Sequence, residues 1–353
     1  MNFKKIILLL FIILLLPSCY YITQGYNLFK TYSKAKKIDK IIKNENLTKE
    51  EIEYFLLIQK IKKYSVEKLG LKNNKNYTKY INIDKNYLVD VVYACEKDSF
   101  NQYKWNYMIM GKMPYKGFFN INKAKKEAEK IKQKGYDVLI GKVDAFSTLG
   151  ILKDPVFSFM KEYSVYDLAD TIFHEQTHAT IFLKKYVDFN ENLANFVGTE
   201  GALLFIKDNY GINSEEYKNT LNYISDSKKF KELINNLYDE LSITYKKDIS
   251  KNEKFNQKKI IINNWKKKFS KNYKKEFKTN TYKKIPKVDI NNAYITIFRT
   301  YTKDLSIFHE LYKYCDYDLK KLIEIVKKLN KYKGNPNEFI KNYIKTQKLK
   351  NNK

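Results

Sequence analysis

The chain has 353 residues, of which 44% are hydrophobic, so it is long enough to bury one large core or two modest ones. Three cysteines are too few for a disulfide scaffold, and the composition excludes a collagen-like or disordered chain. The formal net charge is +28, yet Arg299 is the only arginine and the other basic residues are lysines. Because base readout in nucleic acids relies on arginine, we expect no nucleic-acid partner and only weak attraction to anionic surfaces.

The first residues have the features of a bacterial export signal. Two lysines precede an unbroken apolar run over residues 6–16, which is too short to span a bilayer as a helix. Residues 16–19 read Leu-Pro-Ser-Cys, which resembles a bacterial lipobox. The resemblance implies a signal peptide over 1–18 and acylation of Cys19, which would anchor the protein by lipid in the cell envelope, on the outer membrane or the outer face of the inner membrane. An ordinary signal peptide and a short anchor helix are the alternatives.

Cys95 and Cys315 are the two cysteines that remain in the exported chain. They could form a disulfide. Two lone cysteines this far apart in the sequence are more often buried small hydrophobic residues.

Strands are expected early in the chain and helices late. Residues 20–70 have a helical pattern, residues 87–95 are β-branched and aromatic, residues 122–134 are again helical in pattern, and residues 136–146 are typical of a strand. From about residue 160 onward nearly every segment has a helical pattern. This order predicts an α+β fold that is predominantly helical and contains a small sheet.

Residues 246–287 hold 16 lysines and three acidic residues, a net charge of +13 in 42 residues. A long solvated helical hairpin would explain such a stretch. A dedicated binding site for an anionic partner is the alternative.

The sequence His-Glu-Gln-Thr-His, an HExxH motif, begins at His174. Positions i and i+4 share one face of a helix, so His174 and His178 can hold one Zn²⁺ between them. Glu175 can take a proton from a metal-bound water, and we predict it as the catalytic base. Ser164 and Asp167 suit the start of a helix that would carry the motif. Two surface histidines with a chance glutamate are the alternative.

A catalytic zinc has three protein ligands and one open position. His309 lies in an apolar aromatic segment and is expected to pack in a helix, so a carboxylate is the better candidate for the third ligand. Asn190 is expected to cap a helix whose first turn contains Glu191, while Glu200 lies half a turn away from the Glu191 face. Small residues such as Gly198 share the Glu191 face and permit a close helix–helix approach, so we predict Glu191 as the ligand.

Histidines that bind a metal usually donate their other ring N–H to an acceptor. Asn195, one turn after Glu191, and Asp170, one turn before His174, are the candidates for this role. An ordinary polar rim is the alternative.

The HExxH motif followed by Asn190-Glu191 and Ala194 resembles the gluzincin class of zinc peptidases. A closer resemblance is to a family of bacterial lipoproteins labelled "putative aminopeptidase", and it covers most of the mature chain. The segments that carry this resemblance are 145–150, 154–155, 172–175, 189–191 and 197–201, with Cys19, 24–26, 69–71, 115–119 and 291–293 in the expected order.

The resemblance implies a zincin-like domain over residues 19–353. Its expected parts are N-terminal helices and strands (20–160), a core that holds the motif and Glu191 (161–210), and a lysine-rich helical region (211–353).

The resemblance also implies roles for residues outside the motif. An edge strand and loop beside the cleft would bind an extended peptide, and Tyr301 is a candidate donor to the transition-state oxyanion. The edge strand and loop consist of Phe146, Ser147, Thr148, Leu149 and Gly150.

The expected protein is therefore a lipid-anchored peptidase that uses one Zn²⁺ to hydrolyse peptide substrates. Aminopeptidase activity is implied by the resemblance alone, because the sequence identifies no residue that would bind the substrate amine. The alternatives are a catalytically silent lipoprotein that binds peptide and an envelope anchor that binds anionic cell-wall polymer through residues 246–287.

Overall fold

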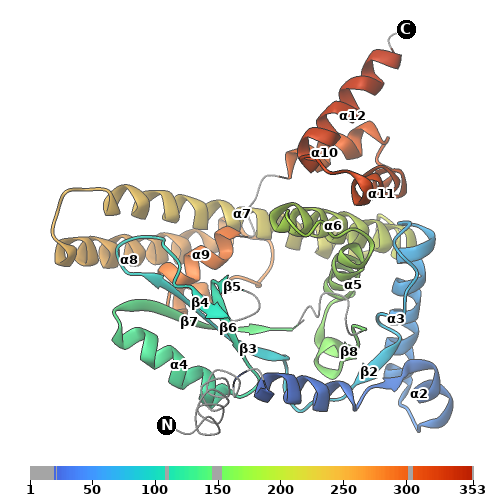
Figure 1. The fold of residues 1–353 in the computed structure, drawn as a ribbon, viewed down its shortest axis with the longest axis horizontal. Coiled ribbons are helices and arrows are strands. Elements are labelled where there is room, and N and C mark those ends of the chain that lie inside the picture. The colour runs from blue at the N-terminus through green and yellow to red at the C-terminus, as the bar shows by residue number, and fades with distance from the viewer. Residues whose placement is uncertain (1–19, 21, 108–110, 145–152, 301–304, 352–353) are drawn as a thin grey trace, which may run out of the picture.

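The computed structural model describes residues 20, 22–107, 111–144, 153–300 and 305–351 (Figure 1). In these segments the strands end by residue 157 and the longest helices follow, which confirms the predicted α+β, mainly helical architecture. The strands are β1 (Lys36–Lys37), β2 (Lys79–Ile81), β3 (Val89–Glu96), β4 (Trp105–Tyr107), β5 (Gly111–Met113), β6 (Tyr115–Phe118), β7 (Tyr136–Val143) and β8 (Val156–Phe157).

Three small sheets lie among the described residues of the first half of the chain. The central strand β3 pairs antiparallel with both β6 and β7, and α4 (Ile121–Gln133) connects these two outer strands. A second sheet has the order β1-β2-β8, with β2 and β8 parallel, and β4 pairs with β5. The strand predicted over 136–146 is observed from Tyr136 to Val143, and the predicted helix over 122–134 is observed as α4.

Helices precede and follow these sheets along the chain. Residues 22–32 form an N-terminal helix, and a capping box of Thr48 and Glu51 starts α3. The remaining helices are α2 (Ile38–Asn44), α3 (Lys49–Glu67), η1 (Ser158–Glu162), α5 (Val165–Thr180), α6 (Val187–Tyr210), α7 (Glu215–Tyr245), α8 (Lys251–Glu276), η2 (Ile285–Lys287), α9 (Asn292–Thr300), α10 (Ser306–Tyr314), α11 (Leu319–Lys327), η3 (Lys328–Lys331) and α12 (Pro336–Asn351).

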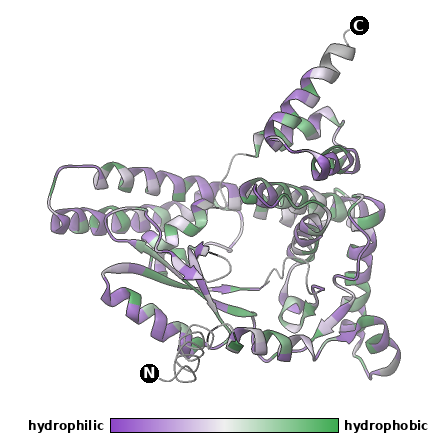
Figure 2. Cartoon of the chain, viewed as in Figure 1, coloured by the Kyte–Doolittle hydropathy of each residue, from purple (hydrophilic) through white to green (hydrophobic). Residues whose placement is uncertain are grey.

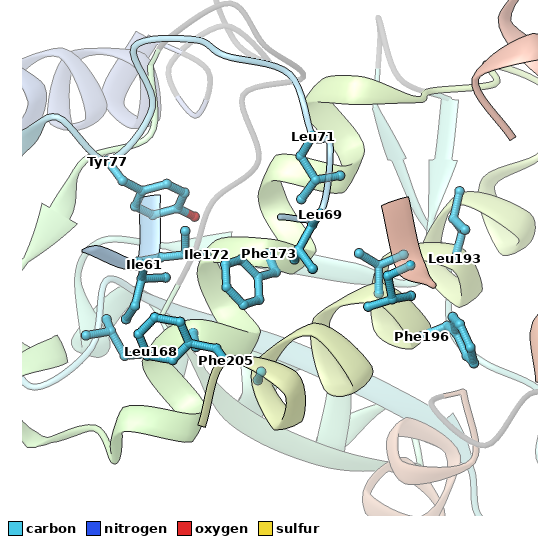
Figure 3. Close-up of a cluster of buried hydrophobic side chains, with 14 of the residues drawn as sticks. Ile61, Leu69, Leu71, Tyr77, Leu168, Ile172, Phe173, Leu193, Phe196 and Phe205 are labelled. Carbon is cyan, nitrogen blue, oxygen red and sulfur yellow. The ribbon is translucent and has the colours of Figure 1, made fainter. Parts of the chain in front are cut away.

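The largest hydrophobic cluster surrounds α5 and α6 (Figure 3). Phe173 of α5 and Phe205 of α6 pack edge to face, and Tyr64 of α3 contacts both rings. Phe308 of α10 packs on Phe189 at the other end of α6. The two helices that carry the candidate site are therefore embedded in the main core from several directions.

The lysine-rich stretch forms α8, which runs beside α7 as a helical hairpin (Figure 1). Phe230 of α7 packs against Phe269 of α8, and the Trp265 indole donates a hydrogen bond to the Leu233 carbonyl at 3.1 Å. Figure 2 shows that most of the hairpin is hydrophilic. The stretch 246–287 therefore supplies one arm of the hairpin, α8, and the other arm is α7, which lies outside it.

Cys95 and Cys315 are both buried and both unpaired, so these two cysteines form no disulfide. Among the residues that the structure describes, no helix combines the length and the apolar character needed to cross a membrane.

Candidate metal centre

Helix α5 carries both histidines of the HExxH motif. The Ser164 side chain caps it by accepting from the Asp167 N–H at 3.0 Å, as predicted, and donates to the Asp167 carboxylate at 2.7 Å. Ile172 and Phe173 are fully buried in the main core, whereas His174 and His178 remain partly accessible. The helix thus fixes two imidazoles on the side that faces away from its apolar contacts.

The predicted start of the second helix is wrong. Helix α6 begins at Val187, and its N-cap residue Tyr186 makes no side-chain capping bond. Asn190 instead lies inside the first turns, where its buried amide accepts from the Leu183 N–H and donates to the Leu183 carbonyl, each at 3.0 Å. An asparagine can satisfy both backbone groups of a loop residue at once, and here this cross-link fixes the α5–α6 loop.

Two glycines let α6 approach α5 closely. A Cβ atom on Gly198 would lie 2.8 Å from Asp170 Oδ1 and 3.0 Å from the Asp170 carbonyl. One on Gly201 would lie 3.0 Å from the Phe173 ring and 2.9 Å from Leu69. The close packing of the two backbones brings a side chain of α6 within reach of both histidines.

That side chain is Glu191. Its Oε2 lies 3.7 Å from His174 Nε2 and its Oε1 lies 3.4 Å from His178 Nε2, while the two Nε2 atoms are 3.1 Å apart. The three ligand atoms lie within 4.8 Å of one another. The structure therefore brings together His174, His178 and Glu191, the three predicted ligands.

These separations fit a single tetrahedral ion. Ligands that lie about 2.0–2.1 Å from zinc in tetrahedral geometry are about 3.3 Å from each other. The two Nε2 atoms are 3.1 Å apart, which is close to this value. Each lies 3.4–3.7 Å from a different oxygen of the Glu191 carboxylate, and the three ligand atoms lie within 4.8 Å of one another. Two imidazole nitrogens and one carboxylate oxygen are also donors that zinc accepts.

The electrostatics of the two imidazoles suit metal binding as well. Burial lowers the pKa of His174 to about 3, with the neighbouring His178 acting in the same direction. Burial lowers the pKa of His178 to about 4. Both rings are therefore neutral at pH 7, and only a neutral imidazole can donate its lone pair to a metal.

Glu175, the predicted base, is a buried carboxyl among other acids. Burial raises its pKa to about 8, and the charges of Asp154 and then Glu191 act in the same direction. Asp154 is itself largely buried, which raises its pKa to about 6. A raised pKa moves a carboxyl toward neutral pH, the range in which a general base both accepts and returns a proton most effectively.

Tyr77 and Asp154 lie near Glu175 and have no role in the site predicted from the sequence. The Tyr77 hydroxyl is fully buried, and after burial the charges of Glu175 and Asp154 do most to raise its pKa. Tyr77 has a φ of 57°, and its N–H donates to the Asp154 carbonyl at 2.6 Å. Asn76 donates to the Asp154 carboxylate at 2.8 Å. Asp154 stands in a segment that carries the family resemblance, but the left-handed conformation of Tyr77 has no sequence signal.

The two predicted supporting residues differ in what they contact. Asn195 hydrogen-bonds to the His174 side chain, which raises the pKa of that ring and opposes the effect of burial. Asp170 instead accepts a hydrogen bond from the Thr199 hydroxyl at 3.4 Å and packs against Gly198. Asn195 is thus placed to orient a ligand, while Asp170 lies in the interface between α5 and α6.

Glu200 and His309 lie near each other, outside the cluster of His174, His178 and Glu191. Burial raises the pKa of Glu200, and the charge of His309 acts in the opposite direction. His309, on α10, packs edge to face on Phe196 with ring centroids 4.9 Å apart. The expected helical position of His309 is confirmed, but its side chain is exposed and contacts the protein through the Phe196 ring.

Three of the predicted sites fall outside the described residues. These are the lipidation site Cys19, the peptide-binding segment Phe146–Gly150 and the candidate oxyanion donor Tyr301.

Two histidines and one glutamate that converge between two helices of an α+β fold define a candidate metal centre. Residues 19–338 match the model of the family described as "Putative aminopeptidase", and the chain belongs to this family. Neither the curated proteins nor the solved structures gave a match to this chain.

Proposed function

We propose that this protein is a zinc-dependent aminopeptidase held at the cell envelope by lipid on Cys19. The observation that carries the proposal is the convergence of His174, His178 and Glu191 beside the buried Glu175, in a chain of an aminopeptidase family. The three side chains would hold the ion and leave one position open. When bound, zinc would lower the pKa of a water in that position and polarise the peptide carbonyl.

Glu175 supplies the proton transfers in this proposal. Its carboxylate accepts a proton from the attacking water and then passes the proton to the leaving amine, so no second acid is needed. Its burial increases its affinity for the proton, while a positive ion beside it would reduce that affinity again. The Asn195 hydrogen bond holds the His174 ring in the orientation that ligation needs.

The substrate contacts of the proposal lie in the segments outside the described residues. Phe146–Gly150 would pair with an extended peptide as an added strand, and Tyr301 would donate to the developing oxyanion. One peptide and one Zn²⁺ are therefore the proposed partners of the site, in addition to the membrane at Cys19.

The first test combines metal analysis with substitution of the base. Glu175→Gln keeps the size of the side chain but cannot accept the proton, so we expect a full equivalent of zinc and hydrolysis reduced by about 10²–10⁴-fold. Glu200→Gln makes the same chemical change on α6, outside the cluster of His174, His178 and Glu191, and is expected to retain activity. His178→Ala is expected to lose the metal. Wild-type activity in Glu175→Gln, or full zinc occupancy in His178→Ala, would contradict the proposed site.

The second part of the test separates exopeptidase from endopeptidase activity. A peptide library is digested with the purified protein, with and without chelator, and the products are read by mass spectrometry. We expect chelator-sensitive release of single residues from free N-termini and no cleavage of N-acetylated peptides. Internal cuts would retain the zinc mechanism and reject the aminopeptidase assignment.

A further inference from the structure

The N-terminal helix, residues 22–32, presents a row of apolar side chains to solvent. Ile22, Tyr26 and Phe29 are 60%, 62% and 71% exposed. Their spacing of four and three residues places them on one face of the helix, and we call this set the N-terminal patch. Single exposed hydrophobic residues are ordinary, but three that share one face mark an interaction surface.

The opposite face of the helix is fixed to the body of the protein. The Tyr20 hydroxyl donates to the Gly117 carbonyl at 2.7 Å, and Gln24 Oε1 accepts from the Phe119 N–H at 3.3 Å. Tyr32, at the end of the helix, packs against the main hydrophobic cluster. Because these contacts hold the inner face, the helix cannot rotate to bury the N-terminal patch.

The charged residues of the helix and of the turn that follows it have one sign. Residues 20–35 contain two lysines, Lys30 and Lys34, and no acidic residue, and both lysines are exposed beside the apolar face. The next lysine, Lys36, is paired with Glu45 at 2.6 Å. Helices that lie in the membrane interface combine an apolar face with flanking lysines, which are attracted to anionic lipid headgroups. A helix of this length is shorter than the roughly 20 residues needed to span a bilayer, so it would lie along the surface.

We infer that the N-terminal patch lies in the interface of a phospholipid bilayer and orients the protein on the membrane. The inference rests on the proposed lipid at Cys19, which is only three residues before Ile22. Three residues extend over at most about 11 Å, so an acylated Cys19 would bring the patch directly to the lipid headgroups. The protein would then be held at a defined angle by the helix, in addition to its attachment by the lipid.

The test uses the full acylated protein in vesicles of phosphatidylethanolamine and phosphatidylglycerol. Phe29→Trp places a fluorophore in the patch, and Ile260→Trp, on an exposed position of α8 (59% accessible), is the matched control. Trp105 and Trp265 fluoresce in every variant, so the wild-type signal is subtracted. Lipids brominated on their acyl chains are expected to quench the remaining Phe29→Trp signal by about half, because interfacial helices bury their apolar face roughly 5–10 Å into the headgroup–acyl boundary. The Ile260→Trp signal is expected to remain unquenched.

Mass spectrometry of the same sample shows whether Cys19 carries acyl chains, and so distinguishes a failure of this inference from a failure of the proposed lipid anchor. An acylated protein whose Phe29→Trp signal is unquenched overturns the inference and retains the anchor. Quenching in a protein whose mass shows no acyl chain supports the inference and contradicts the anchor. Without vesicles, a blue shift of the Phe29→Trp emission that grows with protein concentration would show that the N-terminal patch binds a second copy of the protein. This result would also overturn the inference. Hydrolysis is measured in parallel, so failure of the zinc site is seen independently.

Discussion

Asp170 shows how a single buried carboxyl makes the stability of this protein depend on pH. Burial between α5 and α6 raises its pKa from 3.8 to about 7, and the nearby Asp167 adds to the shift. The hydrogen bond from Thr199 and the charge of Lys231 act in the opposite direction. The folded state therefore holds a proton on Asp170 under conditions in which the unfolded chain has released it.

The consequence is a loss of stability as the pH rises. Below about pH 4 the folded and unfolded states are both protonated at Asp170, so this group does not lower the free energy of unfolding. Between about pH 4 and 7 only the unfolded state ionises, and the free energy of unfolding therefore falls as the pH rises. Asp170→Asn stays neutral and keeps an acceptor for Thr199. We expect it to match wild type at pH 4 and to be more stable at pH 8, by about 1.4 kcal/mol for each unit of pKa shift.

Denaturant unfolding at pH 4, 6 and 8, with chelator present, checks this prediction. Asp239→Asn, at an exposed carboxyl of α7, is the control and should show no such gain. An advantage of Asp170→Asn that is equal at pH 4 and pH 8 would contradict the electrostatic explanation.

At the scale of elements, the contact between α5 and α6 decides whether the candidate site can form. The ligands come from both helices, so their separation depends on how closely the two backbones approach. Gly198 sets that approach, since any side chain there would collide with Asp170 of α5. A change of less than an ångström in helix separation is enough to misplace a metal ligand.

Gly198→Ala is accordingly expected to push the helices apart. Inserting a methyl group into a filled contact typically costs about 1–3 kcal/mol, and we expect a similar loss of stability together with weaker zinc binding. Gly25→Ala is the matched control, because a Cβ atom there meets nothing within 4 Å. Thermal unfolding and zinc titration measure both effects, and equal behaviour of the two variants would show that the contact is not limiting.

At the scale of the whole molecule, one buried ion pair joins the lysine-rich hairpin to the central sheet. Lys258 of α8 is paired with Asp137 of β7, and their side chains are only 10% and 12% exposed. Lys258 also donates to the Lys97 carbonyl at 3.1 Å, and Asp137 accepts from the Asn292 N–H at 2.9 Å. The hairpin is therefore attached to the rest of the protein by a polar network as well as by apolar packing.

Lys258→Ala would leave the Asp137 carboxylate buried without its partner. Removing one member of a buried pair costs about 3–5 kcal/mol, so we expect a large fall in the denaturant midpoint. Lys259→Ala, at the exposed neighbouring position, should unfold like wild type. If both variants lose the same small amount, the pair does not hold the hairpin in place.

The sequence by itself determined the features that depend on helix periodicity. The shared face of His174 and His178 follows from 100° per residue along one helix, and the cap at Ser164 follows from the preference of serine for the N-cap position. The family resemblance is likewise readable from short segments, and the family match over residues 19–338 agrees with it. These features are local, so no knowledge of the chain path was needed.

Only the tertiary structure decided which distant residues surround the site. Asn190 was expected to cap a helix, but the turn before it is already helical and its amide binds Leu183 instead. The contact between Asn76 and Asp154 joins positions 78 residues apart, and it places Asp154 where its charge acts on Glu175. Such contacts depend on how sheets and helices pack in three dimensions. The pattern of residue types along the chain does not show which distant segments will meet.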